Sequence, residues 1–240
     1  MLPSSRIPDR TLDEQRAYYA GRAPEYDEWW LRRGRYDRGE AENRRWFDEV
    51  AELQAIIDSA GFTGDVLELA AGTGNWTERL ARQADRLTAL DASDEMIALN
   101  RERLAKAGLL NRVTYERADL FTWQPERQYD GVFFGFWLSH VPSDRVEDFL
   151  ARVADALQPA GKLALVDSRP DARSTSPDQP LPPEGVELSS RRLNDGRTFE
   201  IVKRYDDPEQ LAATLACHGL EVRVGVTANY FLHAVGRKRR

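Results

Sequence analysis

Residues 66–77 read VLELAAGTGNWT, a short apolar run that leads directly into a turn of glycine and other small residues. A strand, a glycine turn and a helix in this order are typical of the first unit of a parallel α/β sheet, which binds nucleotide-like ligands at the carboxyl end of the strand. Two residues depart from the dinucleotide-binding pattern: Thr77 replaces its third glycine, and Glu68 would repel a pyrophosphate. Because a buried carboxylate is costly unless it is partnered, Glu68 favours a cationic ligand without phosphate.

Strands and helices alternate along the rest of the chain. We expect strands over 65–70, 86–91, 112–119, 129–137 and 158–168, and helices over 75–84, 94–108 and 143–157. A further helix over 207–218 precedes two late strands, over 220–227 and 229–236. This pattern predicts an α/β fold with a doubly wound, Rossmann-like, mostly parallel sheet of seven strands.

The two remaining segments lie outside this alternating core. Two helices, over 11–33 and 40–60, form an N-terminal helical cover, and a β-hairpin insert follows the Pro/Ser-rich connection 169–184. We expect one domain over residues 1–240, divided as follows: helical cover 1–60, cofactor-binding core 61–168, connection and acceptor-side hairpin 169–206, closing helix and strands 207–240.

Polar residues stand at the ends of the next predicted strands. Asp91 ends the second strand, 17 residues after Gly74, where a carboxylate can hold two ribose hydroxyls. Met96 on the following helix could lie against adenine, and Asp119 could accept from the adenine amino group. Each also has a simpler explanation as a helix cap, a core residue or a turn residue. Together they favour a cofactor site, and S-adenosylmethionine (SAM) fits because it carries a sulfonium and an ammonium but no phosphate.

Composition excludes several other classes of function. The net charge of −6 argues against a general nucleic-acid or membrane-surface role. The lone Cys217 leaves no disulfide framework and no thiolate metal site, and we expect no metal. The N-terminus lacks an apolar signal core and no run reaches 18 apolar residues. We expect a soluble, cytoplasmic protein, a monomer or homodimer, that acts on a small molecule.

The motifs resemble those of the class I SAM-dependent methyltransferases. ELAAGTG is similar to their first motif, LTALDAS to their second-strand acidic motif, and RADLF to their adenine-side motif. The resemblance covers nearly the whole chain. It implies that the methionine part of SAM lies beside Glu68, Gly72 and Gly74, the ribose beside Asp91, and the adenine beside Asp119 and Leu120.

Three further segments, YYAGRAPEYD, WLSHVP and DGRTFEIVK, resemble the phosphonate O-methyltransferases of dehydrophos biosynthesis. That resemblance implies that a basic pair on the hairpin, Arg191 and Lys203, holds the anionic acceptor. A tyrosine that serves the same anion in that family has no clear counterpart: Arg33 lies near the matching place and Tyr36 is its neighbour.

Hairpin register decides whether this pair can act together. A three-residue loop places Arg191 opposite Phe199, on the same face as Lys203, whereas a two-residue loop would put Arg192 on that face. An ionised carboxylate or phosphonate needs cations to aim it at the methyl group and needs no base. The alternative is that Arg191 and Lys203 are solvated edge-strand charges.

His140, after the fourth strand, is the candidate base if the acceptor is a phenol, an alcohol or an amine; the alternative is a structural histidine that bonds loop carbonyls. Among the aromatic residues of the first helix, Tyr18 and Tyr26 are expected to roof the cofactor. The segment FGFWLS stands where base-modifying enzymes carry an NPPY-like motif, which speaks against nucleic-acid methylation.

The leading hypothesis is therefore a SAM-dependent small-molecule methyltransferase that O-methylates an anionic, carboxylate or phosphonate-like acceptor. Three alternatives stay open: methylation of a neutral acceptor with His140 as base, a non-catalytic SAM-binding module, and an NAD-dependent oxidoreductase. Thr77 and Glu68 count against the last of these.

Overall fold

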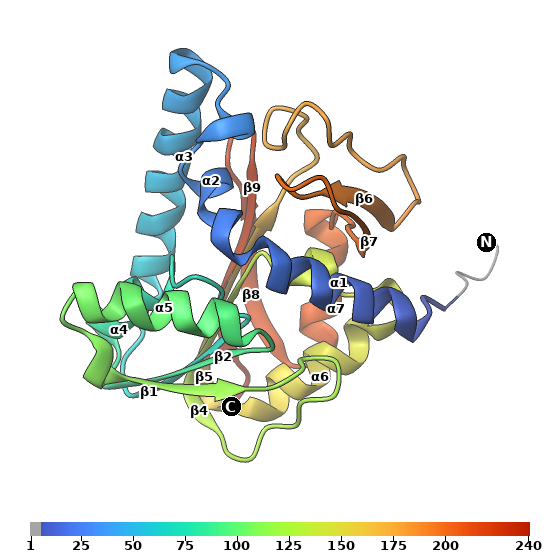
Figure 1. The fold of residues 1–240 in the computed structure, drawn as a ribbon. Coiled ribbons are helices and arrows are strands. Elements are labelled where there is room, and N and C mark those ends of the chain that lie inside the picture. The colour runs from blue at the N-terminus through green and yellow to red at the C-terminus, as the bar shows by residue number, and fades with distance from the viewer. Residues whose placement is uncertain (1–5) are drawn as a thin grey trace.

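The computed structural model describes residues 6–240. Its central element is a seven-stranded sheet in the order β3-β2-β1-β4-β5-β9-β8 (Figure 1). Strands β1 to β5 pair in parallel, whereas β9 runs antiparallel to both of its neighbours. The strands are β1 (Asp65–Leu69), β2 (Arg86–Asp91), β3 (Val113–Arg117), β4 (Tyr129–Gly135), β5 (Leu157–Ser168), β8 (Leu220–Val226) and β9 (Phe231–Lys238).

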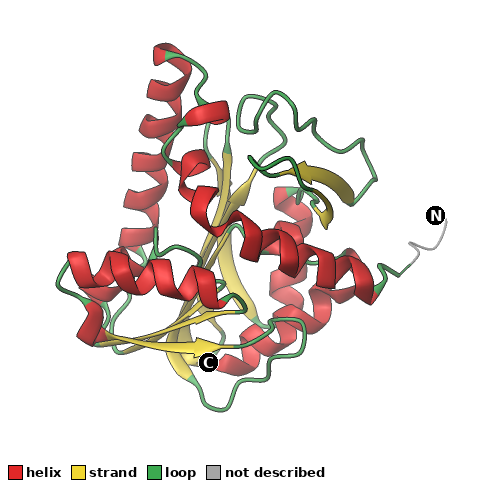
Figure 2. Cartoon of the chain, viewed as in Figure 1, coloured by secondary structure: helices red, strands yellow, loops and turns green. Residues whose placement is uncertain are grey.

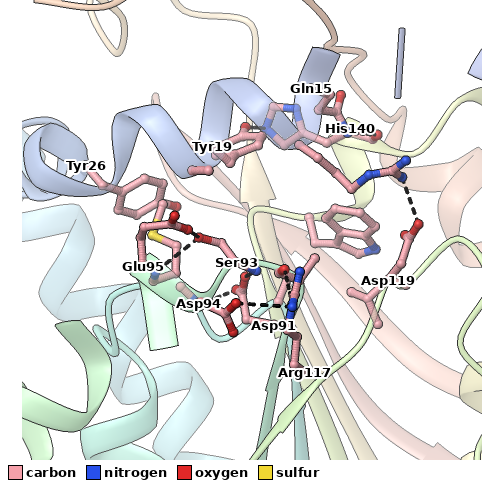
Figure 3. A pocket seen from close by; sticks show the side chains of 18 of the residues that line it. Gln15, Tyr19, Tyr26, Asp91, Ser93, Asp94, Glu95, Arg117, Asp119 and His140 are labelled. Carbon is pink, nitrogen blue, oxygen red and sulfur yellow. Dashed lines mark hydrogen bonds and ion pairs between the residues drawn. The ribbon is translucent and has the colours of Figure 1, made fainter. Parts of the chain in front are cut away.

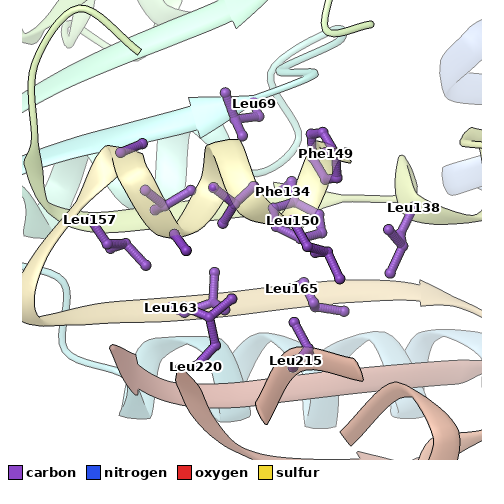
Figure 4. Packing of buried hydrophobic residues seen from close by; sticks show 14 of the residues in the cluster. Leu69, Phe134, Leu138, Phe149, Leu150, Leu157, Leu163, Leu165, Leu215 and Leu220 are labelled. Carbon is purple, nitrogen blue, oxygen red and sulfur yellow. The ribbon is translucent and has the colours of Figure 1, made fainter. Parts of the chain in front are cut away.

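Helices cover both faces of this sheet (Figure 2). Apolar residues of α6 (Val146–Ala156) and α7 (Pro208–Cys217) pack on one face, where Leu150, Leu165 and Leu215 share a buried cluster (Figure 4). A second cluster on the other face joins α3 (Glu40–Ser59), α4 (Thr77–Gln83) and α5 (Asp94–Lys106) to the sheet. This arrangement confirms the predicted doubly wound α/β fold.

The helical cover differs from the prediction of one helix over 11–33. It comprises α1 (Asp9–Arg22), a 3₁₀ turn (Ala23–Glu25), α2 (Tyr26–Trp30) and a second 3₁₀ turn (Gly34–Tyr36). The break falls at Pro24, which has no N–H to donate and whose ring clashes with the carbonyl of the residue four positions before it in a continuous helix. Helix α1 crosses in front of the carboxyl ends of the strands (Figure 1).

The late hairpin forms a separate two-stranded sheet of β6 (Leu188–Arg192) and β7 (Thr198–Val202). Arg191 pairs with Phe199, which confirms the register predicted for a three-residue loop. The side chain of Gln15 on α1 joins this hairpin to the core: its Oε1 accepts from Val202 N–H at 2.9 Å and its Nε2 donates to the His140 carbonyl at 3.1 Å. The hairpin is thereby fixed to both the cover and the loop after β4.

Within residues 6–240, no helix is long and apolar enough to cross a membrane. The same residues contain no group of three or more His, Cys, Asp or Glu side chains arranged to hold a metal ion.

Candidate active site

A cavity of about 410 Å³ lies at the carboxyl edge of the sheet, beneath the helical cover (Figure 3). Parallel sheets of this kind bind ligands at that edge because several strands end there side by side. The cavity wall comes from five stretches of the chain: 15–26, 70–72, 91–96, 117–121 and 135–140.

The turn after β1 forms one side of this cavity. Ala70 and Gly72 line it and both have a φ of 54°. Positive φ is costly for alanine, and such strain is concentrated at functional sites. Gly74 lies behind the wall with a φ of 90°, and a Cβ there would stand 2.8 Å from Asn100 Oδ1. The close approach of Asn100 therefore requires glycine at this position.

Asp91 lines the cavity at the end of β2. Its Oδ2 accepts from Gly72 N–H at 2.8 Å and its Oδ1 from Ser93 N–H at 2.9 Å. Burial raises the pKa of the Asp91 carboxyl group above its usual range. Each carboxylate oxygen can still accept a further hydrogen bond, so Asp91 can both fix the glycine turn and hold ligand hydroxyls.

Glu68 lies beneath the turn and is not part of the cavity wall. Its side chain is buried, contacts the Thr77 hydroxyl, and leaves Oε2 without a hydrogen-bond partner among the described residues. Burial raises the pKa of Glu68 to about 8. Asn100 continues the network: its Nδ2 donates to Thr77 Oγ1 at 2.7 Å and its Oδ1 accepts from the Tyr115 hydroxyl at 2.9 Å. A direct contact of Glu68 with the cofactor stays a prediction.

Three of the predicted adenine-side residues, Met96, Asp119 and Leu120, line the far end of the cavity. Asp119 is engaged from two sides: Arg16 of the cover forms an ion pair with Oδ2 at 2.7 Å, and Phe121 N–H donates to Oδ1 (Figure 3). The cover thus contacts the residue expected to bind the adenine amino group.

The roof of the cavity presents Tyr19 and Tyr26. The expectation for Tyr26 fits its position, but Tyr18 lies on the other side of α1, fully buried against Leu193 and Ile201 and outside the cavity wall. Sequence reasoning missed Tyr19. Helical spacing could have identified it, because residues 15, 19, 22 and 26 recur at intervals of three or four. Each of them lines either this cavity or a smaller neighbouring one described below.

His140 is buried, and both of its ring nitrogens are engaged. Its Nδ1 lies 2.7 Å from the Val202 carbonyl oxygen, which can only accept, so Nδ1 carries the proton and Nε2 accepts from the Tyr19 hydroxyl at 2.8 Å. Burial and the charge of Lys203 hold the pKa of His140 well below its usual range. His140 is therefore neutral, and it lines the cavity beside Tyr19.

A second, smaller cavity of about 70 Å³ adjoins the first and shares Tyr19, Tyr26, Phe136 and His140 with it. Arg191 and Lys203 line it, and each is only 7% exposed. They are therefore not solvated edge charges. Tyr36 also lines this cavity, whereas Arg33 is exposed to solvent.

Few groups of the protein neutralise this basic pair. Lys203 Nζ donates to Ser139 Oγ at 2.8 Å and lies 3.7 Å from Asp167, while Arg191 donates to Ser189 Oγ and the Ser190 carbonyl. Burial lowers the pKa of Lys203 to about 8, although Asp167 opposes this effect. The small cavity is thus suited to an anion.

The Rossmann-like fold, the large cavity at its sheet edge and Asp91 at the end of β2 are typical of enzymes that bind an adenosyl cofactor. Sequence comparison agrees, because a family model described as a methyltransferase domain matches residues 66–161. Two solved structures resemble almost the whole chain. The DhpI–SAH complex is 35% identical with a TM-score of 0.77 over 97% of this chain and 99% of its own. The DhpI–SAM–HEP complex is 36% identical with a TM-score of 0.78 over 97% and 100%. The chain belongs to the class I SAM-dependent methyltransferases.

Curated relatives match shorter parts of the chain. Phosphoethanolamine N-methyltransferase 1 of Triticum aestivum is 32% identical over 125 residues, which are 50% of this chain and 24% of that enzyme. The ubiquinone/menaquinone biosynthesis C-methyltransferase UbiE of Shewanella pealeana is 26% identical over 168 residues, 68% of this chain and 64% of its own. The chain thus spans less than two thirds of either relative. Their names differ in the atom that is methylated.

SAM is the cofactor, and the large cavity fits it. Asp91 has free acceptor capacity at the end of β2, and apolar Met96 and Leu120 line the cavity together with Asp119. Beneath the turn, the buried Glu68 Oε2 lacks a hydrogen-bond partner among residues 6–240. Bound SAM supplies an electrophilic methyl group on a sulfonium. The rings of Tyr19 and Tyr26 stand between the two cavities, where aromatic faces favour a nearby cation.

Proposed function

We propose that this enzyme O-methylates a small anionic acceptor, a carboxylate or a phosphonate-like oxyanion. The observation that carries the proposal is the buried pair Arg191 and Lys203 on the wall of the cavity that adjoins the cofactor cavity. Buried cations are costly unless an anion compensates them, and Asp167 is the one carboxylate within ion-pair distance of either among the described residues.

Two resemblances support an oxyanion. The hairpin segment resembles phosphonate O-methyltransferases, and DhpI, which resembles the whole chain, forms a complex with SAM and HEP. The tyrosine without a clear counterpart in the sequence has a structural candidate in Tyr36, whose side chain is buried on the wall of the small cavity. We assign Tyr36 to the acceptor together with the basic pair.

The proposed chemistry needs positioning more than proton transfer. An ionised oxygen is already a nucleophile, so Arg191 and Lys203 hold it in line with the methyl group and no residue has to remove a proton. Tyr19, Tyr26 and Phe136 line both cavities and so present aromatic surface to the space between them. The cavity volume of about 70 Å³ restricts the buried part of the acceptor to a small group.

Turnover by hairpin variants tests this function. The enzyme is supplied with SAM and a panel of small carboxylic and phosphonic acids, and S-adenosylhomocysteine (SAH) formation is measured by mass spectrometry. Arg191→Ala and Lys203→Ala should each lower kcat/KM by roughly tenfold to over a hundredfold, since a charge-assisted contact contributes about 1.5–3 kcal/mol. Their SAH affinity should stay unchanged because only the acceptor uses these charges.

Arg192→Ala is the matched control. Arg192 belongs to the same strand as Arg191 but is exposed, so its removal should leave turnover and SAH affinity unchanged. Equal losses in Arg192→Ala and Arg191→Ala would mean that net charge, not the cavity, matters. Methylation of phenols, alcohols or amines without methylation of any acid would contradict the proposal.

One observation favours a second candidate, a neutral acceptor: the hydrogen bond between Tyr19 and His140 stands where the cavities meet. For such an acceptor, Tyr19→Phe and His140→Ala should abolish turnover while Lys203→Ala keeps it. For an anionic acceptor, kcat/KM should fall above about pH 8 as Lys203 loses its proton, and Lys203→Arg should move that fall to higher pH.

A further inference from the structure

Arg22, the last residue of α1, is a third cation on the wall of the small cavity. Its guanidinium lies over the rings of Tyr26, at 4.9 Å, and Tyr18, at 5.7 Å, and one terminal nitrogen donates to the Tyr36 hydroxyl at 3.4 Å. Its Nε is buried without a hydrogen-bond partner in the part of the chain that the structure describes. Among residues 6–240, no carboxylate lies within 4.0 Å of this side chain. Arg22 therefore has donors left over, and they face the same space as the hairpin cations.

The charges around this cavity do not balance. Its lining holds Arg22, Arg191 and Lys203, and the described residues that form this lining include no aspartate or glutamate. Asp167 contacts Lys203 at 3.7 Å from outside the lining, and it compensates one positive charge. Nearby Asp206 is already paired with Arg204. The described residues thus leave two positive charges that a ligand can neutralise, and leaving buried charges unpaired is costly.

We infer that the acceptor is a dianion and that Arg22 is an acceptor-binding residue that selects for the second charge; this rests on the proposed function. Either one doubly ionised oxyanion or two neighbouring carboxylates meet the requirement. The guanidinium cannot lose its proton, so Arg22 holds its charge even where Lys203 does not. Its position on the cover, not on the hairpin, lets the anion be held from two separate parts of the chain.

The reaction balances for such an acceptor without proton transfer. One anionic oxygen forms the new C–O bond as the methyl–sulfur bond breaks, and the electron pair of that bond stays on sulfur. The acceptor passes from two negative charges to one, and the sulfonium charge disappears. The product therefore leaves one cation of the cavity uncompensated, which weakens its binding relative to the substrate and favours release.

Calorimetry on the SAH-saturated enzyme tests the inference slightly above neutral pH. One pair of probes is methylphosphonate and its monomethyl ester, which carries a single charge; the other is malonate and its monomethyl ester. In at least one pair the dianion should bind about tenfold or more tightly than the monoester. The pair that shows the preference identifies the source of the two charges, either one oxyanion or two carboxylates.

Variants of Arg22 then test whether this residue binds the second negative charge of the ligand. Arg22→Gln should reduce the dianion preference to about threefold or less, whereas Arg22→Lys should retain most of it because the positive charge remains. Arg35→Gln is the matched control. Arg35 also lies against Tyr36 but is paired with Glu25 and Asp178, and its loss should leave the preference unchanged.

The outcomes separate the inference from the function on which it rests. Equal affinity of dianion and monoester in the unmodified enzyme overturns the dianion requirement while an anionic acceptor stands. Failure of every anion to bind overturns the proposed function itself. A preserved preference in Arg22→Gln, with SAH affinity and melting temperature unchanged, overturns the role of Arg22. If that variant does not fold, the comparison of probes in the unmodified enzyme still decides the charge.

Discussion

Glu68 lies in a buried strand because its side chain contacts Thr77 and so helps to stabilise the glycine turn. Through Thr77 it joins the network of Asn100 and Tyr115, which links β1, α4, α5 and β3 directly beneath the cofactor cavity. Valine or isoleucine would fill the space but could not accept from Thr77. The cost of this arrangement is a buried carboxyl group, one oxygen of which has no hydrogen-bond partner among the described residues.

The burial of the Glu68 carboxyl group predicts that the free energy of unfolding depends on pH. Burial raises the pKa of Glu68 from 4.5 to about 8, so the folded state keeps a proton that the unfolded chain releases. The stability contributed by this group is fully present below about pH 4.5 and is lost as the pH rises through about 8. In the cofactor-free protein, urea unfolding should show that the stability of wild type relative to Glu68→Gln falls by up to about 1.4 kcal/mol per pH unit across that window. Parallel curves for the two proteins would contradict the raised pKa.

Residue-scale prediction failed where the orientation of a helix mattered. The cofactor-site residues at strand ends could be predicted from the sequence, because the carboxyl ends of parallel strands lie together at one edge of the sheet. Tyr18 and Tyr19 are adjacent and chemically identical, and only the rotation of α1 decides that Tyr19 faces His140 and Tyr18 faces Ile201. That rotation is set by packing on the hairpin, nearly 180 residues away, which no local pattern reveals.

At the scale of elements, α2 is attached to the glycine turn by Asp27. The Asp27 carboxylate accepts from Thr73 Oγ1 at 2.6 Å and Asn75 Nδ2 at 3.2 Å and pairs with Arg103 of α5. Two of these partners lie in the turn that forms the cavity wall. The cover and the cofactor-binding loop are therefore coupled through one side chain.

Removing this attachment should weaken cofactor binding without touching the cavity. We expect Asp27→Ala to lower SAH affinity about tenfold. Hydrogen bonds to a charged group contribute about 1.5–3 kcal/mol, and part of this lost free energy lowers the stability of the fold and not the affinity for SAH. Asp37→Ala, which removes a carboxylate that bonds Gly39 and Asn43 within the cover, should leave SAH affinity unchanged. Calorimetry of both variants measures the difference. Equal affinities for wild type and Asp27→Ala would show that the attachment is only structural.

Elements themselves were largely predictable. The hairpin itself was predicted with two loop lengths left open, and the three-residue loop of the structure fixes the register because the side-chain alternation of a strand has a period of two. The break of the first helix at Pro24 was missed, although proline disfavours a helix interior, because the polar and aromatic pattern continues on both sides of it.

At the scale of the whole molecule, alternation of strands and helices was enough to predict the doubly wound sheet, since parallel strands require crossover helices. The small cavity could not be predicted in the same way. It forms where four separate stretches meet, 19–36, 136–140, 168–179 and 191–205, and no sequence relation between them fixes their contact. The basic pair was proposed from resemblance, and the third cation, Arg22, became visible only in three dimensions.

Cofactor binding should stabilise the molecule as a unit, because the large cavity is built from five stretches of the chain. At an SAH concentration about a hundredfold above Kd, linkage adds roughly 2.7 kcal/mol to the free energy of unfolding. For a chain of this size the melting temperature should rise by about 5–10 °C, as measured by differential scanning fluorimetry. NAD serves as the control and should produce no shift; a shift with NAD alone would contradict the cofactor assignment.

The two cavities are lined largely by different regions of the chain, and this separation has a consequence for how related enzymes evolve. Residues that face the large cavity from the sheet belong to 70–140, whereas two of the three cations of the small cavity lie on a hairpin between β5 and α7. Under the proposed function, mutation, insertion or replacement within that hairpin changes the acceptor-binding side while the residues that face the cofactor cavity from the sheet stay intact. On that basis, related enzymes can diverge in acceptor through a segment of fewer than about 20 residues, the length of a single hairpin and its loop.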